Sequence, residues 1–124
     1  MLLVEDEADT LKLLTIVLSE CGAKVTPAAC VTEALAAMEC LMPDVIVSDI
    51  AMPDADGFEF IRRLRSLAPE RGGKTPAAAL TAYAHSDDAA RALAAGFEAH
   101  VAKPCEPAIL ARVVADLAGR KSAA

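Results

Sequence analysis

The sequence predicts an α/β domain in which helices cover both faces of a parallel β-sheet. Short apolar segments alternate with helical periodicities five times along the chain, without an internal repeat or a linker. The 124 residues fit a single domain, and 55% of them are hydrophobic but only 3% aromatic. A core of Ala, Val, Leu and Ile suits helices packed on a parallel sheet. The alternation therefore indicates parallel strands joined by right-handed crossovers.

The first quarter of the chain predicts a strand, a helix and an edge strand. Residues 2–4 form an apolar run that ends in acidic residues. Leucines at helical spacing predict a helix over about 8–21, which Gly22 can stop. Residues 23–28 indicate a weak strand interrupted by Pro27, and proline is tolerated mainly in edge strands. We therefore expect this strand at an edge of the sheet.

The middle of the chain predicts a helix, a buried strand and a third helix. Thr32 can cap the first of these helices, which ends before Pro43. The apolar, β-branched run that follows indicates a buried strand ending at Asp49. Apolar residues at helical spacing predict the next helix over about 57–68. Its outward face, expected in solvent, carries Glu59, Arg62, Arg63 and Arg65.

The next segment predicts a loop, a strand and a short helix. The loop over 69–74 contains two glycines, but it matches no phosphate-binding pattern, so we assign it no chemistry. Residues 76–80 predict a strand that ends at Thr81. Ser86 can cap an alanine-rich helix that stops at Gly96.

The chain closes with a strand and a helix. Residues 97–102 predict the fifth strand, which ends at Lys103. Apolar periodicity predicts a final helix over about 107–118, stopped by Gly119. All five helices and all five strands are then short and closely spaced, as expected for one compact sheet.

Polar residues follow four of the predicted strands, where ligand sites collect in open α/β sheets. Glu5 and Asp6 end the first strand, Asp49 the third, Thr81 the fourth and Lys103 the fifth. Two carboxylates ~5 Å apart repel by about 3 kcal/mol at an effective dielectric of ~20. Lys103 supplies one positive charge. The surplus of carboxylates favours Mg²⁺, a cation that prefers oxygen ligands.

A carboxylate beside Mg²⁺, a lysine and a hydroxyl can accept a phosphoryl group. Asp49 is placed to attack phosphorus in line, while Mg²⁺ and Lys103 neutralise charge on the transferring oxygens and Thr81 donates a hydrogen bond to one of them. The product would be an aspartyl phosphate.

Four motifs resemble the receiver domain of two-component response regulators, in the same order along the chain. They are LLVEDE at 2–7, VSDIAMPDADG at 47–57, LTAYA at 80–84 and AKP at 102–104. The segment over 71–104 looks most like receivers fused to hybrid sensor histidine kinases. The resemblance implies a flavodoxin-like (βα)5 three-layer sandwich with a five-stranded parallel sheet in the order 2-1-3-4-5.

The resemblance also implies a metal site and a reaction. Asp49 is expected to take a phosphoryl group from a phosphohistidine, in a reaction that needs Mg²⁺ or Mn²⁺. The metal is expected to bind Glu5, Asp6, Asp49 and the backbone carbonyl of Ala51. The domain is not expected to be a turnover enzyme on external substrates; it would catalyse its own phosphorylation and dephosphorylation at Asp49.

Two residues depart from the family pattern. Glu5 stands where Asp is common, so its longer arm could bind the metal directly or through water. His100 replaces the usual switch aromatic, whose inward movement accompanies a shift of Thr81 in a receiver, so the coupling is open. Its ring could make switching pH-dependent, or it could simply be partly exposed. The residues expected to modulate the site without reacting are Ala51, Ala82, Tyr83 and Pro104.

The expected partner is a sensor histidine kinase or a histidine phosphotransfer domain, on another protein or in the same polypeptide. A net charge of −6 argues against a surface for nucleic acid or anionic membrane. With no membrane span or signal peptide in the sequence, we expect a cytoplasmic location, and a monomer or weak dimer. The receiver is expected over residues 1–119, with a short tail at 120–124, and the abrupt start suggests a fragment of a longer protein.

Three other functions compete with the phosphoacceptor interpretation. A phosphatase of the haloacid-dehalogenase type needs a DxD motif after the first strand and a cap, which the sequence lacks. A flavodoxin-like cofactor binder needs a phosphate loop rich in Ser, Thr and Gly, where this chain is acidic. A degenerate receiver that binds partners without phosphorylation stays open, because the reactive set is complete but the switch ring is changed.

Overall fold

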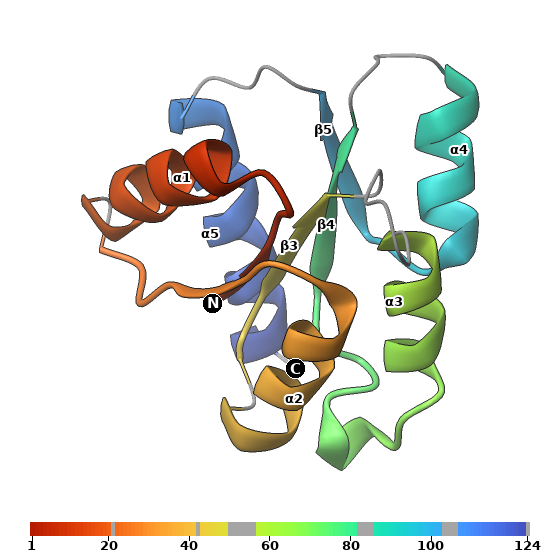
Figure 1. The fold of residues 1–124 in the computed structure, drawn as a ribbon. Helices are drawn as coiled ribbons and strands as arrows, with labels where there is room; N and C mark the ends of the chain where they lie inside the picture. The colour runs from red at the N-terminus through yellow and green to blue at the C-terminus, as the bar shows by residue number, and fades with distance from the viewer. Residues whose placement is uncertain (21, 42, 50–56, 82–85, 103–106, 124) are drawn as a thin grey trace.

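A parallel β-sheet lies between two layers of helices (Figure 1). The computed structural model describes residues 1–20, 22–41, 43–49, 57–81, 86–102 and 107–123. Within these residues the sheet has five strands, which are β1 (Leu2–Val4), β2 (Thr26–Ala28), β3 (Ile46–Asp49), β4 (Ala77–Thr81) and β5 (Ala99–Ala102).

The strand order is β2-β1-β3-β4-β5, with all neighbouring pairs parallel. The predicted fold class, a flavodoxin-like sheet in the order 2-1-3-4-5, is therefore confirmed. The edge position predicted for the strand that contains Pro27 is also correct, since β2 pairs only with β1 in this order. Proline has no N–H group to donate, and an edge strand tolerates this because it has a neighbouring strand on one side only.

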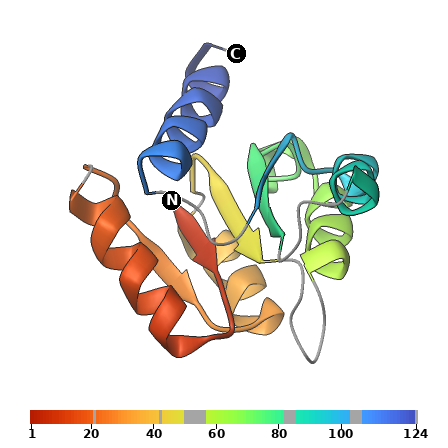
Figure 2. The same ribbon diagram turned by 90° about the horizontal axis from the view of Figure 1, so that it is seen from above.

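Five α-helices within the described residues cover the sheet. They are α1 (Ala8–Glu20), α2 (Val31–Leu41), α3 (Gly57–Arg65), α4 (Ser86–Ala95) and α5 (Pro107–Ala123), and a short 3-10 helix, η1 (Pro69–Arg71), follows α3. Figure 2 shows α1 and α5 on one face, with α2, α3 and α4 on the other. Among the described helices, none combines the length and the apolar character that a membrane crossing requires.

Two hydrophobic cores lie on opposite faces of the sheet, because alternate strand residues point to opposite sides. Leu2 and Val4 of β1 join the core under α2 and α3, which includes the fully buried Phe60. Leu3 joins the core under α1 and α5, which includes the fully buried Leu110. The sheet is therefore buried on both faces, as the aliphatic composition predicts.

The predicted end of the last helix at Gly119 is wrong, because α5 continues to Ala123. A glycine stops a helix when it adopts a left-handed backbone, as Gly22 and Gly96 do with φ angles of 97° and 127°. Gly119 keeps its place within the helix instead. A glycine inside a helix costs only about 1 kcal/mol relative to alanine. The domain boundary expected at residue 119 stays a prediction.

The start of α2 also differs from the prediction. The helix begins at Val31, so Thr32 lies inside its first turn and does not cap it. The carbonyl of Cys30 accepts the first helical bond, from the Ala34 N–H group at 3.0 Å. The carboxylate of Glu33 accepts a bond of 2.8 Å from the backbone N–H of Ala29. The glutamate therefore folds back onto the chain before the helix and fixes that chain against the helix start.

Candidate functional site

Asp49 is the last residue of β3, one of the three inner strands of the sheet. Its side chain is almost fully buried, with 3% of its surface exposed. It follows Ile46 and Val47, which are completely buried, so the strand brings a carboxylate out of the core at its carboxyl end. This position confirms the strand end that the sequence predicts.

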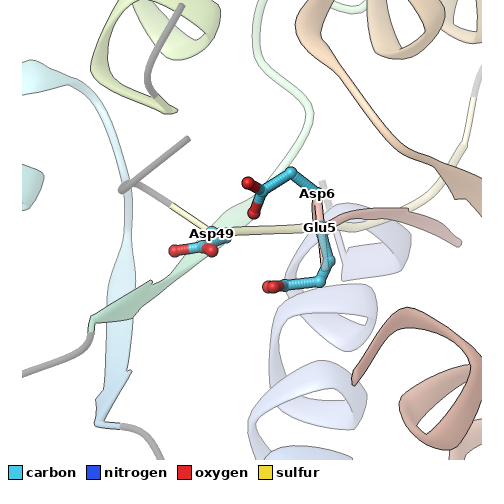
Figure 3. Close-up of side chains that lie close together, drawn as sticks. All are labelled: Glu5, Asp6 and Asp49. Carbon is cyan, nitrogen blue, oxygen red and sulfur yellow. The ribbon is translucent and has the colours of Figure 1, made fainter. Parts of the chain in front are cut away.

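Two further carboxylates come from β1, the neighbour of β3. Val4 of β1 pairs with Ser48 of β3. The next residues along the chain, Glu5 and Asp49, therefore lie beside each other. Glu5 is 1% exposed, whereas Asp6 lies at the surface. Figure 3 shows the three side chains turned toward the same space, and one carboxylate oxygen from each lies within 4.8 Å of the other two.

Local backbone helps to orient one of these groups. An oxygen of the Glu5 carboxylate accepts a bond of 3.4 Å from the backbone N–H of Glu7, at the start of α1. The positive end of the α1 dipole lies here, and it favours negative charge. This effect is worth about 0.3–1 kcal/mol, less than the repulsion of about 3 kcal/mol between two carboxylates ~5 Å apart at an effective dielectric of ~20. The cluster therefore favours a cation.

The donor set fits a hard divalent cation. Mg²⁺ prefers oxygen ligands at about 2.1 Å in an octahedron, so two ligands lie about 3.0 Å apart when adjacent and about 4.2 Å apart when opposite. One oxygen each from Glu5, Asp6 and Asp49 lie within 4.8 Å of one another, so the three groups would draw closer together around the ion. The mixture of buried and exposed carboxylates leaves the cluster open to solvent on the side of Asp6.

The structure places the other predicted site residues only in part. Thr81 is the last residue of β4, and its backbone pairs with Ala102 at the end of β5. His100 lies in β5 and is exposed, and its role in switching stays a prediction. The predicted site residues that lie outside the described parts of the chain are Ala51, Ala82, Tyr83, Lys103 and Pro104.

A buried hydroxyl beside Asp49 was not predicted. Ser48 is fully buried, and its hydroxyl donates a bond of 3.0 Å to the backbone carbonyl of Asp49. The sequence signal was the polar residue within an otherwise apolar strand, directly before the carboxylate. The bond holds the carbonyl at the point where β3 ends.

The prediction that Arg65 lies in solvent is wrong. Its side chain is 20% exposed and forms an ion pair of 2.7 Å with Glu98. Burial lowers the pKa of Arg65, and the charge of Glu98 opposes that shift. Arg65 lies one turn after the buried Ile61, so it borders the apolar stripe of α3. This spacing was the available signal that the residue lies at the border of the buried face.

The comparisons with known proteins agree with the fold. A family model described as the response regulator receiver domain matches residues 1–115. The chain belongs to this family. It is thus a receiver domain of two-component signalling, as the four motifs imply.

Relatives of this receiver domain include free-standing and multidomain proteins. It is 46% identical to an uncharacterized 14.6 kDa protein of Leptolyngbya boryana, over 92% of this chain and 86% of that protein. It is 36% identical to hybrid signal transduction histidine kinase D of Dictyostelium discoideum, over 84% of this chain but only 7% of the kinase. The predicted similarity to receivers of hybrid kinases is confirmed, while the kinase as a whole extends far beyond the match.

Solved structures show the same fold. The receiver domain of the Francisella response regulator 1452 aligns with a TM-score of 0.86 at 27% identity, over 96% of this chain and 95% of that one. The flavodoxin-like arrangement of this receiver is therefore shared at low sequence identity.

Proposed function

We propose that this receiver domain accepts a phosphoryl group on Asp49 from the phosphohistidine of a histidine kinase or a histidine phosphotransfer domain. The observation that carries the proposal is the cluster of Asp49 with Glu5 and Asp6, whose oxygens lie within 4.8 Å of one another at a sheet edge. The similarity to a hybrid histidine kinase supports the donor class.

In the proposed reaction, a carboxylate oxygen of Asp49 forms a bond to phosphorus as the phosphorus–nitrogen bond of the phosphohistidine breaks. The imidazole leaves with the electron pair of that bond and takes up a proton. Lys103 and Thr81, which match the family motifs, would contact the phosphoryl oxygens. Water would later attack the same phosphorus and restore the Asp49 carboxylate.

Glu5 and Asp6, with Asp49, would hold Mg²⁺ or Mn²⁺. The bound cation would supply positive charge that offsets the charge of the transferring phosphoryl group. The carboxylates of Glu5 and Asp6 would fix its place relative to Asp49, and the carbonyl of Ala51 would add a ligand by the family pattern.

The phosphoryl group would act as a switch. It adds negative charge and acceptor oxygens at the edge where β4 ends at Thr81, and it would thereby bias α4, β5 and α5 between two arrangements. We place the domain in the cytoplasm as a monomer or weak dimer, without a role in binding nucleic acid or membranes.

The test is phosphoryl uptake from acetyl phosphate with Mg²⁺, measured by intact-protein mass spectrometry. The wild type should gain one phosphoryl group, which hydroxylamine should remove because the product is an acyl phosphate. Asp49→Asn should gain none. Asp44→Asn is the matched control, because Asp44 is exposed and precedes the opposite end of β3.

Uptake by Asp49→Asn at the wild-type level would rule out the assignment. A wild type that takes up no phosphoryl group from acetyl phosphate or from a phosphorylated kinase would favour the alternative, a degenerate receiver that binds partners without phosphorylation.

A further inference from the structure

Arg65 connects three separate segments at the end of the sheet that lies away from Asp49. Its Nε donates a bond of 3.0 Å to the carbonyl of Gly96, which follows α4. Its Nη1 donates bonds of 3.1 Å and 2.7 Å to the carbonyls of Gly73 and Thr75, which precede β4. One guanidinium thus joins the end of α3 to both of these connections.

Glu98 completes this arrangement. Both of its carboxylate oxygens accept bonds from Nη2 of Arg65, at 2.7 Å and 3.0 Å. One of them also accepts a bond of 2.6 Å from the N–H group of Ala77, the first residue of β4, and the Glu98 N–H donates to the Ala77 carbonyl at 2.9 Å. We call Arg65, Glu98 and these backbone partners the Arg65 clamp.

The backbone around the Arg65 clamp leaves no room for larger residues. Gly96 has a φ angle of 127°, and a Cβ atom there would lie 2.9 Å from Cγ of Arg65. A Cβ atom on Gly73 would lie 1.9 Å from the backbone oxygen of Leu67. The backbone therefore packs closely against the Arg65 side chain at Gly96 and against the segment that follows α3 at Gly73.

The Arg65 clamp lies at the turn of the segment 86–102, which contains α4 and β5. α4 begins at Ser86, after the strand that ends at Thr81, and ends at Ala95, directly before Gly96 of the clamp. β5 then starts beside the clamp and runs back to the edge that holds Asp49. The segment 86–102 therefore turns at the Arg65 clamp, and its carboxyl end lies near the candidate phosphoacceptor. Val101, which is in register with Asp49 across β4, lies three residues after Glu98, about 10 Å away at ~3.3 Å per strand residue.

We propose that Arg65 is a positioning residue for the switch, and that the Arg65 clamp is the fixed pivot of the segment 86–102. The inference rests on the proposed phosphorylation of Asp49. A segment anchored at one end responds to a change at the other by turning about the anchor. Structural change on phosphorylation is then confined to the parts of α4 and β5 near Asp49.

A merely structural role for Arg65 leads to a different expectation. Weakening an anchor that only stabilises the fold would speed amide exchange equally in the unphosphorylated and phosphorylated states. Weakening a pivot would let the response to phosphorylation spread into residues 93–99. The change in amide exchange between the unphosphorylated and phosphorylated states therefore distinguishes the two roles, even if the variant is less stable.

The experiment is hydrogen–deuterium exchange of the full chain, with and without Mg²⁺ and beryllium fluoride, a mimic of an aspartyl phosphoryl group. In the wild type, exchange at 93–99 should differ less than about twofold between the states, while 86–90 changes more strongly. In Arg65→Lys, which keeps the charge but loses the planar fork, the difference at 93–99 should exceed about fivefold.

Two further variants make the test decisive. Glu98→Gln keeps an acceptor oxygen for Ala77 but removes the charge, so it should act in the same direction as Arg65→Lys and serves if that variant fails to fold. Arg63→Lys is the matched control, because Arg63 lies on the same helix in an exposed pair with Glu59, 2.6 Å apart. It should leave the difference profile as in the wild type.

Three outcomes would overturn the inference. If the wild type responds but Arg65→Lys and Glu98→Gln keep its difference profile, the pivot is wrong and the proposed function stands. The same holds if the wild-type response is largest at 93–99. If the wild type shows no response to beryllium fluoride anywhere, the proposed function fails and the pivot fails with it.

Discussion

The two ends of the sheet hold charged side chains in opposite ways. At the carboxyl ends of β1 and β3, three groups of the same sign, Glu5, Asp6 and Asp49, lie within 4.8 Å. At the starts of β4 and β5, Arg65 and Glu98 have opposite signs and also bond to backbone groups. Among the described residues, the first end gathers like charges, and the second pairs opposite charges.

This difference in charge arrangement distinguishes a site that binds a ligand from a contact that stabilises the fold. Like charges held together raise the free energy of the folded state until a cation binds, so such a cluster is explained by a ligand. An ion pair surrounded by backbone carbonyls satisfies its own hydrogen bonds and needs no ligand. Removing a charge should therefore have opposite effects on stability at the two ends.

The largest effect is expected at the Arg65 clamp. Arg65→Met should lower the free energy of unfolding by about 2–3 kcal/mol, because Glu98 loses its counter-charge and the carbonyls lose their donor. Urea denaturation followed by circular dichroism measures this loss. Arg63→Met, at the exposed pair with Glu59, should change it by no more than about 0.5 kcal/mol. Equal losses in the two variants would contradict the contrast between them.

A change of opposite sign is expected at the acidic end. Without Mg²⁺, Asp49→Asn should raise the free energy of unfolding by about 1–2 kcal/mol, because it removes one of three like charges. Glu98→Gln should lower it by about 1 kcal/mol. Both values come from urea denaturation with a chelator at low ionic strength, and high salt should reduce the gain.

Mg²⁺ should remove most of the difference in the free energy of unfolding between Asp49→Asn and the wild type. At tenfold over its Kd, a ligand stabilises a folded protein by about 1.4 kcal/mol. Asp49→Asn, with one carboxylate fewer, should gain much less. If Asp49→Asn has a lower free energy of unfolding than the wild type in the chelator, positive charge within the protein already balances the acidic cluster.

The smallest effect is expected at His100. The residue is exposed in β5, so His100→Tyr should change the free energy of unfolding by less than about 0.5 kcal/mol. We also expect the exchange profile of the beryllium fluoride state to be the same at about pH 6 and about pH 8. A profile that changes with pH in the wild type but not in His100→Tyr would instead assign the ring a role in switching.

Much of the fold and part of the site follow from local sequence. The apolar run before Asp49 predicts the end of β3, and the acidic residues after Val4 predict the end of β1. Parallel strands bring their carboxyl ends to one edge, so the meeting of Glu5 with Asp49 follows from the alternation of strands and helices. The positions of Lys103 and Ala51 stay predictions.

The sequence by itself therefore determined the end of each strand and the edge at which the carboxylates meet. Strand ends depend on neighbouring residues, and the shared edge follows from the rule that crossovers join parallel strands. Only the tertiary structure decided the place of Arg65, because its partners Gly96 and Glu98 lie 31 and 33 residues away. A side chain at the border of an apolar stripe turns toward solvent or protein according to which acceptors the fold brings beside it. Local periodicity contains no information about those acceptors.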